Sequence, residues 1–267
     1  MPIPYAEVVG DPIAHSKSPL MHRYWLESLG IEADYRARQV RLAEVGAYLA
    51  VRRKDPLWRG CNVTAPLKTE VLAHLSAIGP DARAIGAVNT IVPQGDEELL
   101  GVNTDAHGAL LALAGVEVGD AAIIGAGGAA RAALFALKVM GVERVVVINR
   151  DMIRARAALD DLEMDGRVLP LGTSPAVDLL INASPLGMSG QPETPFDLSV
   201  LPIGATVFDM VYAPLETPLL AGARTRGLAT IDGLRMLAEQ GAVAFAAFFQ
   251  DGPEVADTQE LREVLRS

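Results

Sequence analysis

Short apolar runs alternate with helix-like segments over nearly the whole chain. Ala121–Ile124 and Leu179–Asn182 have the length and apolar character of strands buried inside a sheet. Leu42–Arg52 and Asp151–Leu162 are longer and mix apolar with charged residues, as helices do. This alternation predicts an α/β fold with a parallel, doubly wound sheet.

In the first part of the chain, proline and glycine mark the ends of the predicted elements. Ser18 is placed to cap a helix that has Pro19 at its first position and stops at Gly30. Pro93 would end one strand, and the polar turn Gln94–Glu98 lets that strand pair with the next. The predicted strands are Tyr5–Gly10, Asp34–Val40, Cys61–Thr64, Ala87–Val92 and Leu99–Val102, and two further helices are Leu42–Arg52 and Leu67–Leu75.

The pattern of predicted elements changes near Asn103, and from there strands and helices alternate regularly. The last segment is helical only, at Gly233–Phe249 and Glu254–Arg266, and we expect it to pack on the first part of the chain. We therefore predict two domains, residues 1–102 with 234–267 and residues 103–233. The predicted strands of the second domain are Ala121–Ile124, Arg144–Ile148, Leu179–Asn182, Val207–Met210 and Leu228–Ile231. Its predicted helices are Asp105–Ala114, a long helix from the glycine cluster after Ile124 to Met140, Asp151–Leu162 and Glu216–Arg226.

Composition narrows the possible functions. The 267 residues are 50% hydrophobic, which suits two compact domains, and the net charge of −10 gives no electrostatic footprint for nucleic acid. An anionic substrate must therefore be held by a local pocket. The single cysteine, Cys61, lies in an apolar stretch and is expected to be a buried hydrophobe in a reducing cytoplasm. Neither a signal peptide nor a membrane span is expected.

The first chemical motif is a glycine cluster between a buried strand and a helix. It fits the pattern G-x-G-x-x-A, in which the first glycine allows a tight turn and the second lets the backbone approach a pyrophosphate. The phosphates would lie at the positive N-terminus of the helix. A structural β–α turn is the alternative, and the strand–turn–helix context favours a dinucleotide site. Its candidate residues are Gly125, Gly127, Gly128 and Ala129.

The end of the following strand indicates which dinucleotide binds. Arg150 and Arg154 lie four residues apart and suit the 2′-phosphate of NADP, with Asn149 beside them. Asp151 either favours the helix N-terminus or repels that phosphate and relaxes the preference toward NAD. We favour NADP, and NAD remains the alternative.

Four polar clusters follow predicted strands, where the crevice of an open α/β sheet forms. Each has a structural alternative as a helix cap, a turn or a solvated lysine. Together with four later motifs, they resemble the shikimate dehydrogenase family from about residue 5 to residue 250. The motifs are S-x-S-P at Ser16–Pro19, N-V-T-x-P-x-K at Asn62–Lys68, G-A-V-N-T at Gly86–Thr90, N-T-D at Asn103–Asp105, G-A-G-G-A at Gly125–Ala129, N-A-S-P-L-G-M at Asn182–Met188, D-x-V-Y-x-P-x-x-T-P at Asp209–Pro218 and D-G-L-x-M-L-x-x-Q at Asp232–Gln240.

The resemblance implies a reaction and the residues that carry it. The enzyme would reduce 3-dehydroshikimate to shikimate with NADPH, on the way to chorismate and the aromatic amino acids, using Lys68 as the catalytic lysine and Asp105 as its acidic partner. The first domain would bind substrate, and the second would be a Rossmann-type NADP-binding domain. Substrate would contact Ser16, Ser18, Asn62, Thr64, Lys68, Asn89, Asp105, Tyr212 and Gln240, and Ser184, Met210 and Gly233 would lie around the nicotinamide.

The chain departs from the family pattern at four places. Leu67 stands where histidine is usual, Ala106 where glycine is usual, Arg23 where asparagine is common and Asp151 where threonine is common. The first two lie beside Lys68 and Asp105 and could change rate or substrate preference. Asp151 bears on the choice between NADP and NAD.

Two rival functions remain open at this point. A quinate/shikimate dehydrogenase using NAD would keep the same lysine and aspartate, and a cofactor-binding sensor without turnover would not need them. His15, His22, His74 and His107 lack the spacing of metal ligands, so no metal is expected, and His22 is expected to pack or to cap. The sequence leaves open whether the chain is a monomer or a homodimer.

Overall fold

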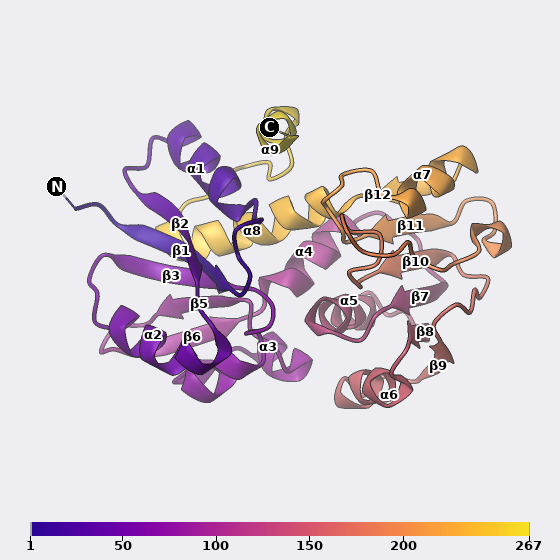
Figure 1. Ribbon diagram of the computed structural model, residues 1–267, viewed down its shortest axis with the longest axis horizontal. Helices are drawn as coiled ribbons and strands as arrows, with labels where there is room; N and C mark the ends of the chain where they lie inside the picture. Colours follow the sequence, from indigo (N-terminus) through magenta and orange to yellow (C-terminus); the bar gives the residue numbers. More distant parts are fainter. Residues whose placement is uncertain (1, 267) are drawn as a thin grey trace. The chain divides into compact units, whose positions relative to one another are not determined.

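The computed structural model describes residues 2–266 and divides the chain into two compact units. Unit 1 is Met1–Thr104 with Ala238–Ser267, and unit 2 is Asp105–Leu237. Each unit is an α/β body built on its own six-stranded sheet (Figure 1). Within residues 2–266, no helix is long and apolar enough to cross a membrane.

The sheet of unit 1 is mixed. Its strand order is β2-β1-β3-β5-β6-β4, in which β1 pairs parallel with β2 and β3, whereas β5 runs antiparallel to β3 and β6. The pairing of β5 with β6 across the polar turn was predicted and is confirmed. The strands are β1 (Tyr5–Gly10), β2 (Asp34–Gln39), β3 (Trp58–Val63), β4 (Ala77–Ile78), β5 (Thr90–Pro93) and β6 (Leu99–Val102).

Helices cover both faces of this sheet. Aromatic side chains of α1 (Ser18–Ser28) and α8 (Gly233–Phe249) gather with Tyr35 of β2 over one face. The other face packs against α2 (Val45–Arg52) in a core that contains Cys61, whose side chain is fully buried as expected. The remaining helices of this unit are α3 (Pro80–Ile85) and α9 (Gln259–Arg266).

The sheet of unit 2 is parallel throughout and doubly wound. Its strand order is β12-β11-β10-β7-β8-β9, so the chain winds outward in both directions from a switch point between β7 and β10. Figure 1 shows the strands in this order. They are β7 (Asp120–Ile124), β8 (Arg144–Asn149), β9 (Gly166–Pro170), β10 (Leu179–Asn182), β11 (Thr206–Asp209) and β12 (Ala229–Ile231).

Alternate residues of the central strand β7 face two separate cores in unit 2. Ala121 and Ile123 belong to the core under α4 (Thr104–Ala112), α5 (Gly128–Val139) and α6 (Met152–Asp161). Ala122 and Ile124 face the opposite core, which includes α7 (Pro218–Thr225). Burial on both faces explains why β7 and β10 were visible in the sequence as continuous apolar runs.

The structure corrects several predicted boundaries. Ser18 is the first residue of α1 and not its cap, because Lys17 occupies the N-cap position. The Ser18 N–H donates to the Ser16 hydroxyl at 3.3 Å. The predicted helix Leu67–Leu75 reduces to a 3₁₀ segment at Glu70–His74, so Lys68 lies on the turn before it.

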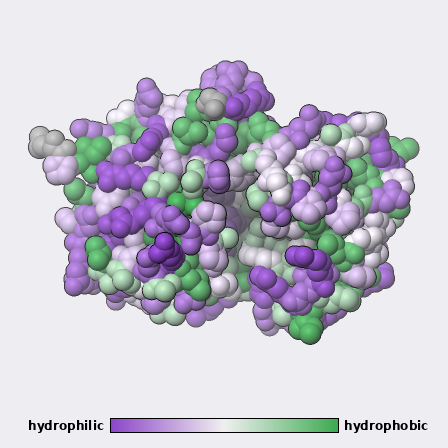
Figure 2. Space-filling view, in the orientation of Figure 1, coloured by the Kyte–Doolittle hydropathy of each residue, from purple (hydrophilic) through white to green (hydrophobic). Residues whose placement is uncertain are grey.

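Exposed apolar residues on unit 2 include Ile153 and Val139. On the face drawn in Figure 2, hydrophobic residues are interspersed with hydrophilic ones. Singly exposed apolar residues are ordinary for a protein surface and identify no docking site.

Candidate active site

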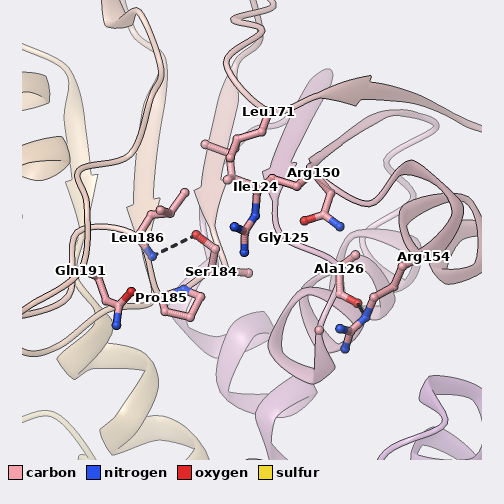
Figure 3. Close-up of a pocket in the computed structure, with 13 residues that line it drawn as sticks. Ile124, Gly125, Ala126, Arg150, Arg154, Leu171, Ser184, Pro185, Leu186 and Gln191 are labelled. Atoms are coloured by element: carbon pink, nitrogen blue, oxygen red, sulfur yellow. Dashed lines mark hydrogen bonds between the residues drawn. The ribbon is translucent and has the colours of Figure 1, made fainter.

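A pocket of about 350 Å³ opens at the carboxyl ends of the strands of unit 2, beside the switch point (Figure 3). Ligands bind at such a crevice in doubly wound sheets. It contains six of the predicted cofactor residues, contributed by the ends of β7, β8 and β10 and by the start of α6. The lining residues are Ile124, Gly125, Ala126, Gly127, Asn149, Arg150, Arg154, Leu171, Ala183, Ser184, Pro185, Leu186 and Gln191.

The two glycines of the turn have different physical reasons. Gly125 has φ +119°, and a Cβ there would lie 2.8 Å from the carbonyl oxygen of Ala183, so a larger residue would strain the turn. A Cβ on Gly127 would meet only the Arg154 guanidinium, at 3.9 Å, so the backbone stands open to a ligand. Gly128 and Ala129 open helix α5 directly after it. This cradle and the helix N-terminus fit a pyrophosphate.

Two arginines border the glycine turn, as Figure 3 shows. The Nε of Arg154 donates to the Ala126 carbonyl at 3.1 Å, which fixes this guanidinium beside the turn. Asp151 is the N-cap of α6, because its carboxylate accepts the Arg154 N–H at 3.0 Å. The first of the two explanations offered for Asp151, a helix cap, is therefore observed. Two guanidinium groups at this edge fit a 2′-phosphate.

A buried hydrogen-bond network joins the loops that follow β10 and β11. The Asp209 carboxylate accepts hydrogen bonds from Asn182 Nδ2 at 2.9 Å, Val211 N at 3.1 Å and Thr217 Oγ1 at 2.6 Å. Burial raises the pKa of Asp209, and these donors act against that rise. The Ser184 hydroxyl donates to Asn182 Oδ1 at 2.7 Å, so the network also fixes a pocket residue.

Met210 and Gly233 lie against each other. A Cβ on Gly233 would be 2.5 Å from the Met210 carbonyl oxygen, so only glycine permits this approach. Tyr212 follows two residues later, and burial raises the pKa of its phenol. Met210 and Tyr212 thus lie in the loop after β11, and Gly233, the first residue of α8, packs against the start of that loop.

In unit 1, Ser16 and Ser18 lie together at the start of α1. The Ser16 hydroxyl caps the Ser18 N–H, and Ser18 is buried. Lys17, between them, donates from Nζ to the Leu265 carbonyl at the end of α9. The lysine of this segment is therefore anchored on the C-terminal helix.

The amides of Asn62, Asn89 and Gln240 belong to one buried array. Asn62 Nδ2 donates to Thr90 Oγ1 at 2.9 Å, and Thr90 Oγ1 donates to Asn89 Oδ1 at 3.1 Å. Asn89 Nδ2 lies 3.5 Å from Gln240 Oε1. The array brings together residues from β3, β5 and α8 that are far apart in the sequence.

Thr64 and Lys68 lie on the segment that follows β3, and Asp105 lies at the start of α4. The Lys68 carbonyl accepts the Val88 N–H at 2.8 Å, and Thr64 directly follows β3. Asp105 is the second residue of α4 and is buried. Thr104, which precedes it, donates its N–H to Asn89 Oδ1 at 2.6 Å.

Sequence reasoning did not single out several polar residues of these networks. Thr90 and Thr104 belong to quoted motifs, and Asn182 and Asp209 each begin one, so the motifs held the signal. Tyr35 had no such signal, because an aromatic residue in a strand is typical of a core. Among residues 2–266, no group of three or more His, Cys, Asp or Glu residues could hold a metal ion.

Known proteins are similar to this chain in sequence and in fold. The family model for the shikimate dehydrogenase substrate binding domain matches residues 8–91 of this chain. Shikimate dehydrogenase (NADP(+)) of Sphingopyxis alaskensis is 50% identical over 265 residues, covering 98% of this chain and 97% of that protein, and its namesake from Methylobacterium radiotolerans is 45% identical, covering 97% and 95%. The solved structure of shikimate 5-dehydrogenase from Thermus thermophilus, in complex with NADP(H) and shikimate, is 40% identical, with a TM-score of 0.89 over 99% of each chain. The chain therefore belongs to the shikimate dehydrogenase family.

Proposed function

We propose that this chain catalyses the reversible, NADPH-dependent reduction of 3-dehydroshikimate to shikimate. The observation that carries the proposal is the 50% identity, over nearly the full length of both chains, to shikimate dehydrogenase (NADP(+)) of Sphingopyxis alaskensis. The arginine-flanked glycine pocket of unit 2 supports the cofactor, and the serine, threonine and amide groups of unit 1 suit a carboxylated polyol.

Unit 1 would hold the substrate. Ser16 and Ser18 present hydroxyl groups at the start of α1, and these would bind the carboxylate. Thr64, Asn89 and Gln240 would bind ring hydroxyls, with Asn62 close by and Tyr212 of unit 2 as a further contact.

Lys68 would act on the oxygen that changes its bonding. A ketone that gains hydride becomes an alkoxide, and the ammonium of Lys68 would stabilise that charge and donate a proton to it. In the oxidation direction, the neutral amine would accept the proton of the substrate hydroxyl. Asp105 would orient the lysine and accept a hydrogen bond from a substrate hydroxyl.

Unit 2 would hold the dinucleotide. Gly125, Gly127, Gly128 and Ala129 would face the pyrophosphate, and Asn149, Arg150 and Arg154 would contact the adenosine ribose and its phosphate. Ser184, Met210 and Gly233 would border the nicotinamide, and NADPH, when bound, supplies the hydride.

The test is an absorbance assay of reduced nicotinamide with purified protein. Shikimate with NADP⁺ should give turnover, whereas quinate and NAD⁺ in parallel should give much less. Lys68→Ala should lower kcat by about 100-fold, or roughly 3 kcal/mol, while NADP⁺ still binds. Lys54→Ala, at an exposed lysine, should leave kcat unchanged. Near-normal turnover by Lys68→Ala would refute the catalytic assignment, and quinate as the better substrate would refute the proposed function.

The cellular setting and assembly are further parts of the proposal. We place the enzyme in the cytoplasm, where its single, buried Cys61 stays reduced. The assembly is proposed to be a monomer or a homodimer, which light scattering after size exclusion distinguishes.

A further inference from the structure

We propose that Tyr35 is a positioning residue for the substrate, acting through Asn62 and Thr90 on Asn89. The inference rests on the proposed function, because Asn89 is placed there as a substrate contact. Tyr35 itself is fully buried in β2, and its hydroxyl donates to Asn62 of the array.

A directional chain of hydrogen bonds begins at Tyr35. Its phenol donates to Asn62 Oδ1 at 2.6 Å, which assigns the two ends of that amide: Oδ1 toward the phenol and Nδ2 toward Thr90. Asn62 Nδ2 donates to Thr90 Oγ1 at 2.9 Å, and Thr90 Oγ1 in turn donates to Asn89 Oδ1 at 3.1 Å. Asn62 Nδ2 also donates to the Asn89 carbonyl at 3.4 Å, so the phenol and that carbonyl together hold the Asn62 amide in this direction.

The chain ends on the orientation of the Asn89 amide. With its oxygen facing Thr90 and the Thr104 N–H, the Nδ2 of Asn89 faces Thr104 Oγ1 at 3.0 Å and Gln240 Oε1 at 3.5 Å. A flipped Asn89 would present a donor to the Thr104 N–H. The orientation of both amides proposed to read substrate hydroxyls therefore depends on one network.

The sheet register explains how a tyrosine of β2 reaches an asparagine of β3. Tyr35 pairs with Ala6, Ala6 pairs with Gly60 and Val8 pairs with Asn62, so all five residues share one face of the parallel strands. Ala6 carries only a methyl group between Tyr35 and Asn62 on that face. We infer that its small size leaves room for the phenol to cross β1 diagonally.

His22 holds the tyrosine ring in place. The two rings stack with centroids 3.8 Å apart and an interplanar angle of 11°. Both nitrogens of His22 are buried without a hydrogen-bond partner among the described residues, and burial lowers its pKa to about 3. His22 is therefore a neutral, flat surface against Tyr35, which restricts the phenol to the direction of Asn62.

Tyr35→Phe removes only the hydroxyl and keeps the stacked ring. The buried Oδ1 of Asn62 then loses its phenol donor, and the Asn62 amide is held from its Nδ2 side alone, by Thr90 and the Asn89 carbonyl. We therefore expect KM for shikimate to rise about tenfold, with a smaller fall in kcat. Kd for NADP⁺ should not change, because every residue of this hydrogen-bond chain lies in unit 1. In an Asn62→Ala background, Tyr35→Phe should have almost no further effect on KM.

Tyr48→Phe is the matched control. Tyr48 is also a buried tyrosine of unit 1, but its hydroxyl donates to the Glu7 carboxylate at 2.8 Å, outside the array. It should lower thermal stability and leave KM for shikimate unchanged. If Tyr35→Phe does not fold, Thr90→Val, which breaks the next link of the chain, should give the same rise in KM.

The outcomes separate the possible failures. If the wild-type enzyme is active with shikimate and Tyr35→Phe changes only the melting temperature, Tyr35 is purely structural and the inference is overturned. A rise in KM with Tyr48→Phe as large as that with Tyr35→Phe would overturn it as well. If the wild-type enzyme does not oxidise shikimate, the proposed function fails first.

Discussion

At the scale of single residues, the buried His22 makes the stability of the fold depend on pH. Its imidazole is fully buried, and burial lowers its pKa from 6.5 to about 3. The unfolded chain binds a proton here below pH 6.5, whereas the folded chain does not until about pH 3. Folding stability contributed by this group is therefore fully present above pH 6.5 and falls as the pH drops toward 3, by about 1.4 kcal/mol per pH unit.

We expect His22→Phe to remove this part of the acid sensitivity. The phenyl ring keeps the stack on Tyr35 and removes two buried nitrogens that lack partners among the described residues. Urea denaturation measures the free energy of unfolding of both proteins between about pH 7 and pH 4. As the pH falls over this range, the difference should shift in favour of the variant, by roughly 3 kcal/mol at pH 4. His15→Gln replaces an exposed histidine and should leave the pH dependence as in the wild type. Parallel stability curves for His22→Phe and wild type would contradict the argument.

Most residues proposed for the site could be named from sequence motifs, whereas the residues that hold them in place could not. Arg150 and Arg154 could be proposed for the pocket because two cations four residues apart follow a predicted strand, and both line the pocket in the structure. The role of Tyr35 could not be found, because it depends on the register of β2, β1 and β3 and on the small size of Ala6. Long-range pairing leaves no local trace in composition.

At the scale of elements, the buried parallel strands were the most predictable. Strands Tyr5–Gly10 and Leu179–Asn182 were predicted with the bounds that the structure has. Strand β9 was missed because it is an edge strand, half exposed, with no apolar run. The segment Leu67–Leu75 was predicted as a helix with Pro66 near its start, yet it forms turns around Lys68 and only a short 3₁₀ segment after them.

The start of α6 combines a helix cap with the cofactor site, which allows its charge to be tested separately. Asp151→Ser keeps an oxygen that accepts the Arg154 N–H and removes one negative charge beside the two arginines. We expect KM for NADP⁺ to fall roughly fivefold, or about 1 kcal/mol, because the 2′-phosphate no longer faces a carboxylate. KM for NAD⁺, which lacks that phosphate, should change little.

Asp151→Ala distinguishes the charge from the cap. It removes both, so it should share the gain for NADP⁺ and also lower the melting temperature, consistent with a lost cap worth about 1 kcal/mol. An unchanged KM for NADP⁺ in both variants would show that the carboxylate acts only on the helix.

At the scale of the whole molecule, two anionic ligands are proposed to bind a protein with a net charge of −10. The long-range field opposes both, so affinity must come from local groups within each unit. Arg150, Arg154 and the N-terminus of α5 provide them in unit 2, and all are contained in one continuous stretch of chain. Unit 2 also has two cores of its own.

These facts predict that residues 105–237 fold and bind cofactor without the rest of the chain. The fragment keeps the six parallel strands, both cores including Met236, and every residue that lines the pocket. We expect cooperative thermal unfolding, a Kd for NADP⁺ within about tenfold of the full chain, and no turnover with shikimate, because Lys68 is absent. Calorimetric titration measures the affinity, and the fragment with Arg150→Ala and Arg154→Ala should lose its preference for NADP⁺ over NAD⁺. A folded fragment that does not bind NADP⁺ would mean that the glycine turn and the arginines are insufficient, and that the rest of the chain supplies essential cofactor contacts.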